Sequence, residues 1–246
     1  YASVYAVFSL FFANFQKVVT SFTNGLTFKF GQMFHTDFER FKREFSLYET
    51  VYYTLLFAAY TILTAFLMPV IRLYTSGIAD AAIYDNTVAL LLFAAVTALT
   101  GTEAPMLQQL YVAGKFDDTR NQAIWEMAIN ITVSIIATWR FGLIGCLIGT
   151  VAALLYRNNA LIIYTARRIL DRSCLQLYKK IAVNLALGAG IIMLLGTDSC
   201  EATSYLHVIL TVIPNALWIA AVFIAVNVLI NLRECIAFVR AHRRRA

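Results

Sequence analysis

Four polar side chains recur every three or four residues in an otherwise apolar run from about residue 2 to residue 28. They are Asn14, Lys17, Ser21 and Asn24. On a helix this spacing places all four on one face. A lysine inside an apolar run costs a few kcal/mol where it faces lipid, so the stripe should face protein or water. The ammonium group could then bind an anion. Alternatively, Lys17 extends its long side chain to the headgroups at the membrane surface.

Two further charged groups interrupt apolar segments. Arg157 is followed by Asn158 and Asn159 well before its apolar run ends. Its guanidinium could line a cavity, or it could bond to a helix carbonyl inside the protein. Glu103 lies near the middle of another run. A carboxyl at that depth is a candidate site for proton or cation coupling. The alternative is a neutral acid that is bonded to a Gln or Thr on a neighbouring helix.

Residues of the kinds that form metal and enzyme sites are not grouped in this sequence. The three histidines (His35, His207 and His242) lie far apart, and the cysteines at positions 146, 174, 200 and 235 show no metal or redox spacing. No Gly-rich phosphate loop, nucleophile elbow or paired-carboxylate motif is found. We therefore expect no metal, no cofactor and no enzymatic activity.

The composition predicts an all-α, polytopic helical membrane protein. Hydrophobic residues make up 60% of the 246 residues and charged residues 14%. A soluble domain is closer to half apolar and a quarter charged. The net charge of +6 arises from basic residues at the ends of apolar segments. Because that distribution orients a membrane protein, nucleic acid is not an expected partner.

The region from Thr119 to Ile169 contains two apolar runs of nearly membrane-spanning length, joined by a few residues around Arg140. So short a connection predicts an antiparallel helical hairpin. Three glycines at helical spacing, Gly142, Gly145 and Gly149, are predicted to pack against another helix, since a small-xxx-small pair permits close approach.

Polar residues also have a pattern in the first half of this hairpin. Asn130 and Ser134 are four residues apart and share one helix face, and Glu126 precedes Asn130 by four residues. Glu126 lies nearer the end of the run. Its carboxylate could pair with Arg120 or face solvent.

About seven membrane spans are expected, at residues 2–28, 50–73, 87–113, the two halves of the hairpin, 181–196 and 213–232. Lys and Arg concentrate at 29–46, 114–120, 167–180 and in a basic tail at 233–246, whereas 74–86 and 197–203 contain none. The positive-inside rule then predicts a cytoplasmic C-terminus and an external Tyr1. An odd number of spans that begins outside suggests a fragment with further residues before Tyr1.

A distinct segment at 30–48 separates the first two spans. Its aromatic residues repeat at helical spacing, and charged residues occupy much of the remainder. This pattern predicts one amphipathic helix that lies in the membrane interface with its aromatic side down. The alternative is a solvated connector helix.

Six segments of the chain, taken in order, form a recognisable series: SVYAVF at 3–8, LYTSGI at 73–78, AGKFxxTRN at 113–121, INxxxS at 129–134, FGLIGxxIGT at 141–150 and LYR at 155–157. Together they resemble bacterial polysaccharide flippases of the multidrug/oligosaccharidyl-lipid/polysaccharide exporter superfamily. The resemblance covers nearly the whole chain and matches the C-terminal half of such a protein. It implies two helical lobes around a central cavity, with residues 1–246 forming most of the C-terminal lobe.

The same resemblance implies a function in the bacterial cytoplasmic membrane. Such proteins move an undecaprenyl-pyrophosphate-linked oligosaccharide from the inner to the outer leaflet by alternating access. Pyrophosphate is a dianion, so the polar stripe around Lys17, together with Arg157, supplies the candidate substrate-binding residues. Glu103 is the coupling candidate. Other proteins of polysaccharide assembly and membrane lipids are further expected partners.

Two other functions compete with this one. A cation-coupled multidrug antiporter of the same superfamily should present acids such as Glu103 to its substrate. A membrane-embedded synthase or ligase of polysaccharide assembly usually has a sizeable external loop with catalytic acids or arginines. The external loops expected here are short.

Overall fold

The computed structural model describes residues 2–24, 26–78, 80–197 and 204–231. Every regular element in these ranges is helical, which confirms the all-α prediction. The long helices are α1 (Ala2–Asn24), α2 (Thr27–Thr36), α3 (Phe38–Thr75), α4 (Thr87–Val112), α5 (Arg120–Phe141), α6 (Leu143–Tyr164), α7 (Cys174–Leu195) and α8 (Tyr205–Ile230). Short 3₁₀ turns form η1 (Ala81–Tyr84) and η2 (Asp117–Thr119), and a π-helical turn, η3 (Thr165–Ile169), extends α6.

Five of the described helices are long and apolar enough to cross a membrane: α3, α4, α6 with η3, α7 and α8. In α1 the apolar stretch is shorter, from Ser3 to Val19. These lengths are compatible with a membrane protein, since about 20 apolar residues in a helix cover the hydrocarbon core.

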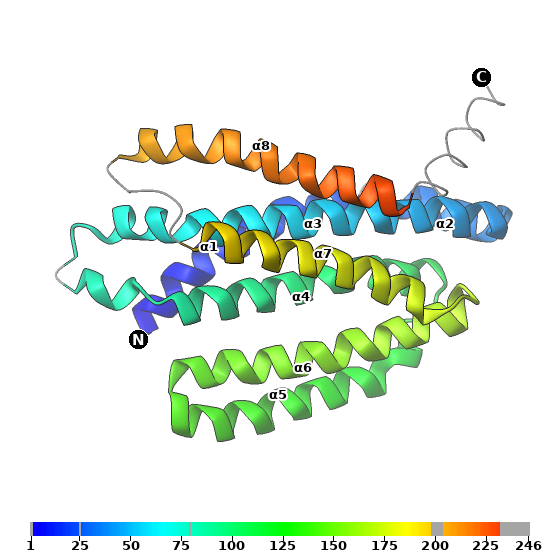
Figure 1. The fold of residues 1–246 in the computed structure, drawn as a ribbon. Helices are drawn as coiled ribbons and strands as arrows, with labels where there is room; N and C mark the ends of the chain where they lie inside the picture. Colours follow the sequence, from blue (N-terminus) through cyan, green and yellow to red (C-terminus); the bar gives the residue numbers. More distant parts are fainter. Residues whose placement is uncertain (1, 25, 79, 198–203, 232–246) are drawn as a thin grey trace.

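The longest helix, α3, organises the bundle. It contacts α2, α4, α7 and α8, while α1 packs on α4. The hairpin of α5 and α6 joins the bundle through α6, which packs on α4. Figure 1 shows α8 along one side of the bundle and the hairpin along the opposite side, with α3, α4 and α7 between them.

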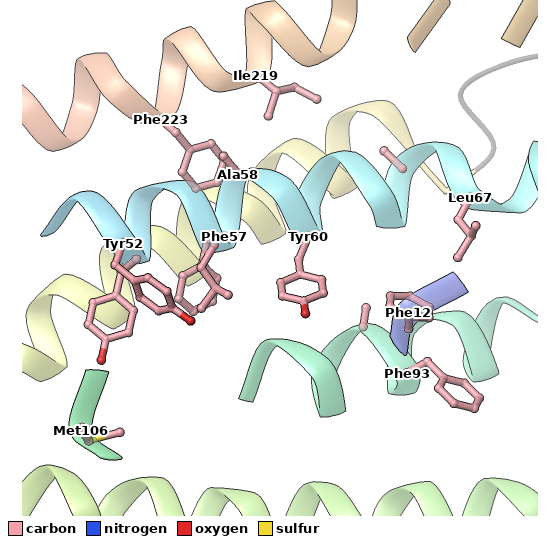
Figure 2. Packing of buried hydrophobic residues seen from close by; sticks show 14 of the residues in the cluster. Phe12, Tyr52, Phe57, Ala58, Tyr60, Leu67, Phe93, Met106, Ile219 and Phe223 are labelled. Atoms are coloured by element: carbon pink, nitrogen blue, oxygen red, sulfur yellow. The ribbon is translucent and has the colours of Figure 1, made fainter. Parts of the chain in front are cut away.

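Aromatic side chains dominate the core. The rings of Phe8 and Phe12 on α1 stack on Phe93 of α4, with centroids 5.7 and 6.0 Å apart. From the other side, Ile219 and Phe223 of α8 point toward α3 (Figure 2). The apolar face of α1 that carries Phe8 and Phe12 is therefore buried against α4.

A proline inside α4 leaves a backbone group that α3 satisfies. Pro105 has no N–H, so the carbonyl oxygen of Gly101 lacks its usual partner four residues later. The hydroxyl of Tyr52 donates to that oxygen at 2.8 Å, and the Tyr53 hydroxyl donates to the next carbonyl, of Thr102, at 3.2 Å. This pairing holds the helix pair together at the depth of Glu103.

The segment predicted as one amphipathic helix at 30–48 is two helices, so that prediction was wrong. The chain breaks at Asp37, whose carboxylate accepts a hydrogen bond from the backbone N–H of Arg40 and caps α3. From there α3 continues without interruption to Thr75. The physical reason is helix capping. Asp is a favoured N-cap residue, because its carboxylate accepts a hydrogen bond from a backbone N–H that has no partner in the first turn of the new helix.

The aromatic stripe of this segment packs within the protein. Phe30 of α2 lies against Phe45 of α3, with ring centroids 5.0 Å apart, and Phe34 lies 5.2 Å from Phe41. Phe41 and Phe45 are fully buried. Because α2 and α3 cover this side of each other, these rings pack against protein, and the position of the segment at a membrane surface stays a prediction.

The predicted hairpin has α5 and α6 joined at Gly142. This residue has φ of +57°, a conformation that side-chain-bearing residues rarely adopt. A Cβ added to Gly145 would lie 2.2 Å from the Ala137 carbonyl carbon, and one added to Gly149 would lie 2.1 Å from the Ser134 hydroxyl. Gly145 and Gly149 therefore let the two helix backbones approach closely.

Candidate functional site

The described part of the polar stripe lies on the exposed face of α1. Asn14, Lys17 and Ser21 are all exposed, while Phe8 and Phe12 on the opposite face are buried. The Lys17 ammonium lies 3.4 Å from the Asn14 side-chain oxygen, to which it donates. The side chain of Asn24 lies outside the described residues, as does the tail at 233–246. The stripe thus offers a cation beside an amide on a surface that the rest of the described chain leaves uncovered.

Arg157 is buried inside the hairpin. Its Nη1 donates to the backbone carbonyl of Thr119 at 3.1 Å, and its Nε lies 3.6 Å from the Glu126 carboxylate. The sequence left two arrangements of Arg157 open, a cavity lining and a bond to a carbonyl inside the protein. The structure shows the bond to a carbonyl. Glu126 was expected to pair with Arg120 or to face solvent. It pairs with Arg157 instead, because α6 brings the guanidinium back beside the start of α5.

Glu103 lies next to α6 rather than beside a Gln or Thr. Its carboxylate is 3.5 Å from the side-chain nitrogen of Asn158, which also donates to the carbonyl oxygens of Leu99 and Leu154. The Glu103 side chain is buried, and the charges of Glu126 and Arg157 act on it electrostatically. Helices α4, α5 and α6 therefore share one polar cluster, in which Glu103, Arg157 and Asn158 are buried and Glu126 is partly exposed.

A second buried cluster was missed by the sequence analysis. We define the Glu49 cluster as Glu49 and Ser46 of α3, Gln109 of α4, Arg172 before α7 and Lys180 of α7. The Glu49 side chain has no exposed surface, and its carboxylate lies 2.5 Å from Arg172 Nη2 and 3.8 Å from Lys180 Nζ. The Gln109 amide donates to the same carboxylate at 3.0 Å.

Lys180 is also bound by Ser46. The ammonium donates to the Ser46 backbone oxygen at 2.7 Å and to its hydroxyl at 2.8 Å. One carboxylate is therefore shared by two cations. Breaking such a buried pair by removing one partner typically costs about 3–5 kcal/mol, so the cluster ties α3, α4 and α7 together.

A signal for this cluster exists in the sequence. Glu49 lies four residues after Phe45 on the aromatic stripe, so it shares a helix face that had to be buried. A carboxylate on that face needs a cation as a partner. The basic residues at 167–180 were interpreted only as orientation signals, although Lys180 lies on the buried face of α7.

Polar contacts also line the inside of the hairpin. The Ser134 hydroxyl of α5 donates to Asn130 at 3.0 Å and approaches the Cys146 carbonyl oxygen of α6 at 3.4 Å. The polar face predicted for Asn130 and Ser134 is therefore turned toward the partner helix. Within the described residues, no group of three His, Cys, Asp or Glu side chains could hold a metal ion.

Comparisons with known proteins do not identify a family. No protein-family model, no curated protein and no solved structure matches the chain.

Proposed function

We propose that this chain is a lobe of a transporter that moves an undecaprenyl-pyrophosphate-linked oligosaccharide across the bacterial cytoplasmic membrane by alternating access. In this proposal α1 and α5 add two spans to the five apolar helices, giving about seven. The C-terminus lies in the cytoplasm. The substrate is the lipid-linked oligosaccharide, and other proteins of cell-surface polysaccharide assembly are partners.

One observation carries the proposal: Lys17 and Asn14 form an exposed polar stripe on a helix whose other face is buried in an aromatic core. An exposed ammonium within a membrane segment is costly unless water, protein or an anion compensates it. A second lobe facing α1 would enclose the stripe in a passage, where Lys17 and Asn14 would bind a pyrophosphate. Arg157 is engaged by Thr119 and Glu126, so the proposal depends on Lys17.

The test is to replace Lys17 in cells that depend on the protein for surface polysaccharide. We expect Lys17→Ala to lower export by roughly tenfold or more, since a hydrogen bond to a charged group is worth about 1.5–3 kcal/mol. Lys17→Arg should retain most export. Lys179→Ala, which removes an exposed lysine on α7, is the matched control. Full export by Lys17→Ala at normal membrane levels would contradict the site.

A cation-coupled antiporter of the same superfamily is the second candidate. The observation that favours it is the buried carboxyl of Glu103 beside Asn158. Glu103→Gln should then abolish cation-driven efflux of a cationic dye from proteoliposomes, while Lys17→Ala leaves efflux unchanged. The opposite pattern, export lost only with Lys17, supports the flippase.

A further inference from the structure

A pocket opens on the hairpin, and no residue of α1 lines it. Its volume is about 340 Å³, and it is lined by Gln122 of α5, by Ala160, Ile163 and Tyr164 of α6, and by Arg167 and Arg168 of η3. It lies where α5 begins and α6 ends, at the end of the bundle that also carries α2 and the loop between α4 and α5 (Figure 1). Most of the predicted cytoplasmic basic residues belong to this end.

The pocket presents two guanidinium groups without counter-ions. Arg167 and Arg168 are exposed, and neither side chain forms an ion pair or hydrogen bond in the described part of the chain. The backbone oxygen of Arg168 accepts a hydrogen bond from the Lys115 ammonium at 3.4 Å, which brings a third cation nearby. An acid that contacts the pocket wall, Asp118, accepts a hydrogen bond from the hydroxyl of Tyr164. The pocket is therefore suited to an anion. A guanidinium group can donate two parallel hydrogen bonds to the oxygens of a phosphate.

A second polar group indicates what else the ligand carries. The side-chain oxygen of Gln122 is buried and accepts no hydrogen bond in the described residues. A buried acceptor normally has a donor, so a ligand with a hydroxyl or ammonium group would complete it. Inorganic phosphate could donate through its P–OH groups and a glycerol headgroup through its two hydroxyls, so the rest of the pocket wall must distinguish between them.

The remaining wall is apolar. Ile163 and Ala160 lie one helical turn apart on α6, and Ile163 is 44% exposed. Because α6 with η3 is long and apolar enough to cross a membrane, the pocket lies at the end of a span, where headgroups meet hydrocarbon. Basic pockets between helices at this level bind anionic lipid headgroups.

We propose that this pocket binds the headgroup of an anionic glycerophospholipid of the phosphatidylglycerol type. The phosphate lies between Arg167 and Arg168, a headgroup hydroxyl donates to Gln122, and an acyl chain runs along Ile163. The site is independent of the proposed transport function, because it uses no residue of the α1 stripe.

The experiment uses Trp125, which lies three residues after Gln122 on α5 and is mostly exposed. The chain with Trp139→Phe and Trp218→Phe retains this tryptophan as its only one. It is reconstituted in phosphatidylcholine bilayers with rising fractions of brominated phosphatidylglycerol or, separately, brominated phosphatidylcholine. We expect stronger quenching by the anionic lipid at equal fraction. The selectivity should fall by roughly 30-fold in Arg167→Ala/Arg168→Ala, because each arginine near the surface contributes about a factor of five.

Two controls make the outcome decisive. Arg43→Ala/Lys179→Ala removes two exposed cations outside the pocket and should leave the selectivity unchanged. Ala160→Phe keeps both arginines but fills the pocket, so it should also lower the selectivity, and it decides the question if the double arginine variant does not fold. Equal quenching by the two lipids, or an unchanged response in both pocket variants, overturns the proposal. Reversal of quenching by millimolar inorganic phosphate would show that the ligand is a soluble phosphate, which also overturns the lipid assignment.

Discussion

At the scale of single residues, Glu49 has the most demanding environment. Its carboxylate is fully buried between Arg172 and Lys180, which come from another part of the chain. Neither cation is adjacent to Glu49 in sequence, so spacing alone gave no indication of the pairing. Only the face that Glu49 shares with Phe45 pointed to burial. Its partners depend on how α7 packs on α3, and the residue spacing within single helices does not predict that packing.

Removing the Glu49 charge should destabilise the protein. Glu49→Gln leaves two buried cations without their carboxylate, which we expect to cost about 3–5 kcal/mol. Glu39→Gln on the same helix is the control: its pair with Lys42 is largely exposed, and such pairs are worth less than about 1 kcal/mol. Thermal unfolding in detergent measures both variants. Equal melting temperatures for the two would refute a stabilising role for the Glu49 cluster.

The Tyr52 hydroxyl gives a second test at this scale. Tyr52→Phe leaves the carbonyl oxygen of Gly101 buried and unpaired opposite Pro105. We expect a loss of about 1–3 kcal/mol. Tyr74→Phe, an exposed site on the same helix, should change little. The comparison is made by thermal unfolding, and a neutral Tyr52→Phe would mean that water replaces the hydroxyl.

At the scale of elements, some features followed from spacing and others did not. The hairpin of α5 and α6 could be expected because two apolar runs are joined by so few residues at Gly142. The break at Asp37 could not, because the aromatic stripe continues in register across it and only the hydrogen bond to Arg40 reveals the cap. Similarly, the sequence placed Arg157 in a polar segment but left its partner on α5 undetermined.

The glycines of the hairpin can be tested against a glycine in open space. Gly149→Ala should destabilise the protein, because the new Cβ would lie 2.6 Å from the Ser134 backbone nitrogen. Gly190→Ala on α7 meets nothing within 4 Å and should stabilise its helix by up to about 1 kcal/mol. Melting temperatures should therefore shift in opposite directions. A rise for Gly149→Ala would show that the helices separate easily.

At the scale of the whole molecule, the orientation in the membrane remains a prediction from charge. The sequence between α3 and α4 and the sequence between α7 and α8 contain no Lys or Arg, and they join the helix ends opposite to the basic segments at 114–120 and 167–180. The helical class follows from composition. The side of the membrane on which each helix end lies does not follow from the fold, because the fold contains no membrane.

Cysteine accessibility tests this orientation. In a background in which the four native cysteines are replaced by serine, Gly77→Cys should react with a membrane-impermeant thiol reagent in intact cells. Asp117→Cys should react only after permeabilisation. Both sites are exposed, and a Cβ at Gly77 has open space. Labelling of Asp117→Cys alone in intact cells would reverse the orientation.

The uninterrupted run of α3 from Phe38 to Thr75 makes it much longer than the bilayer is thick. At 1.5 Å per residue, its 38 residues extend about 57 Å, against roughly 30 Å of hydrocarbon. In a membrane, nearly half of this helix would extend beyond the hydrocarbon layer, or the helix would tilt steeply. The portion that bears Glu49 is at the end flanked by basic loops, so in a membrane the Glu49 cluster would lie near headgroup level.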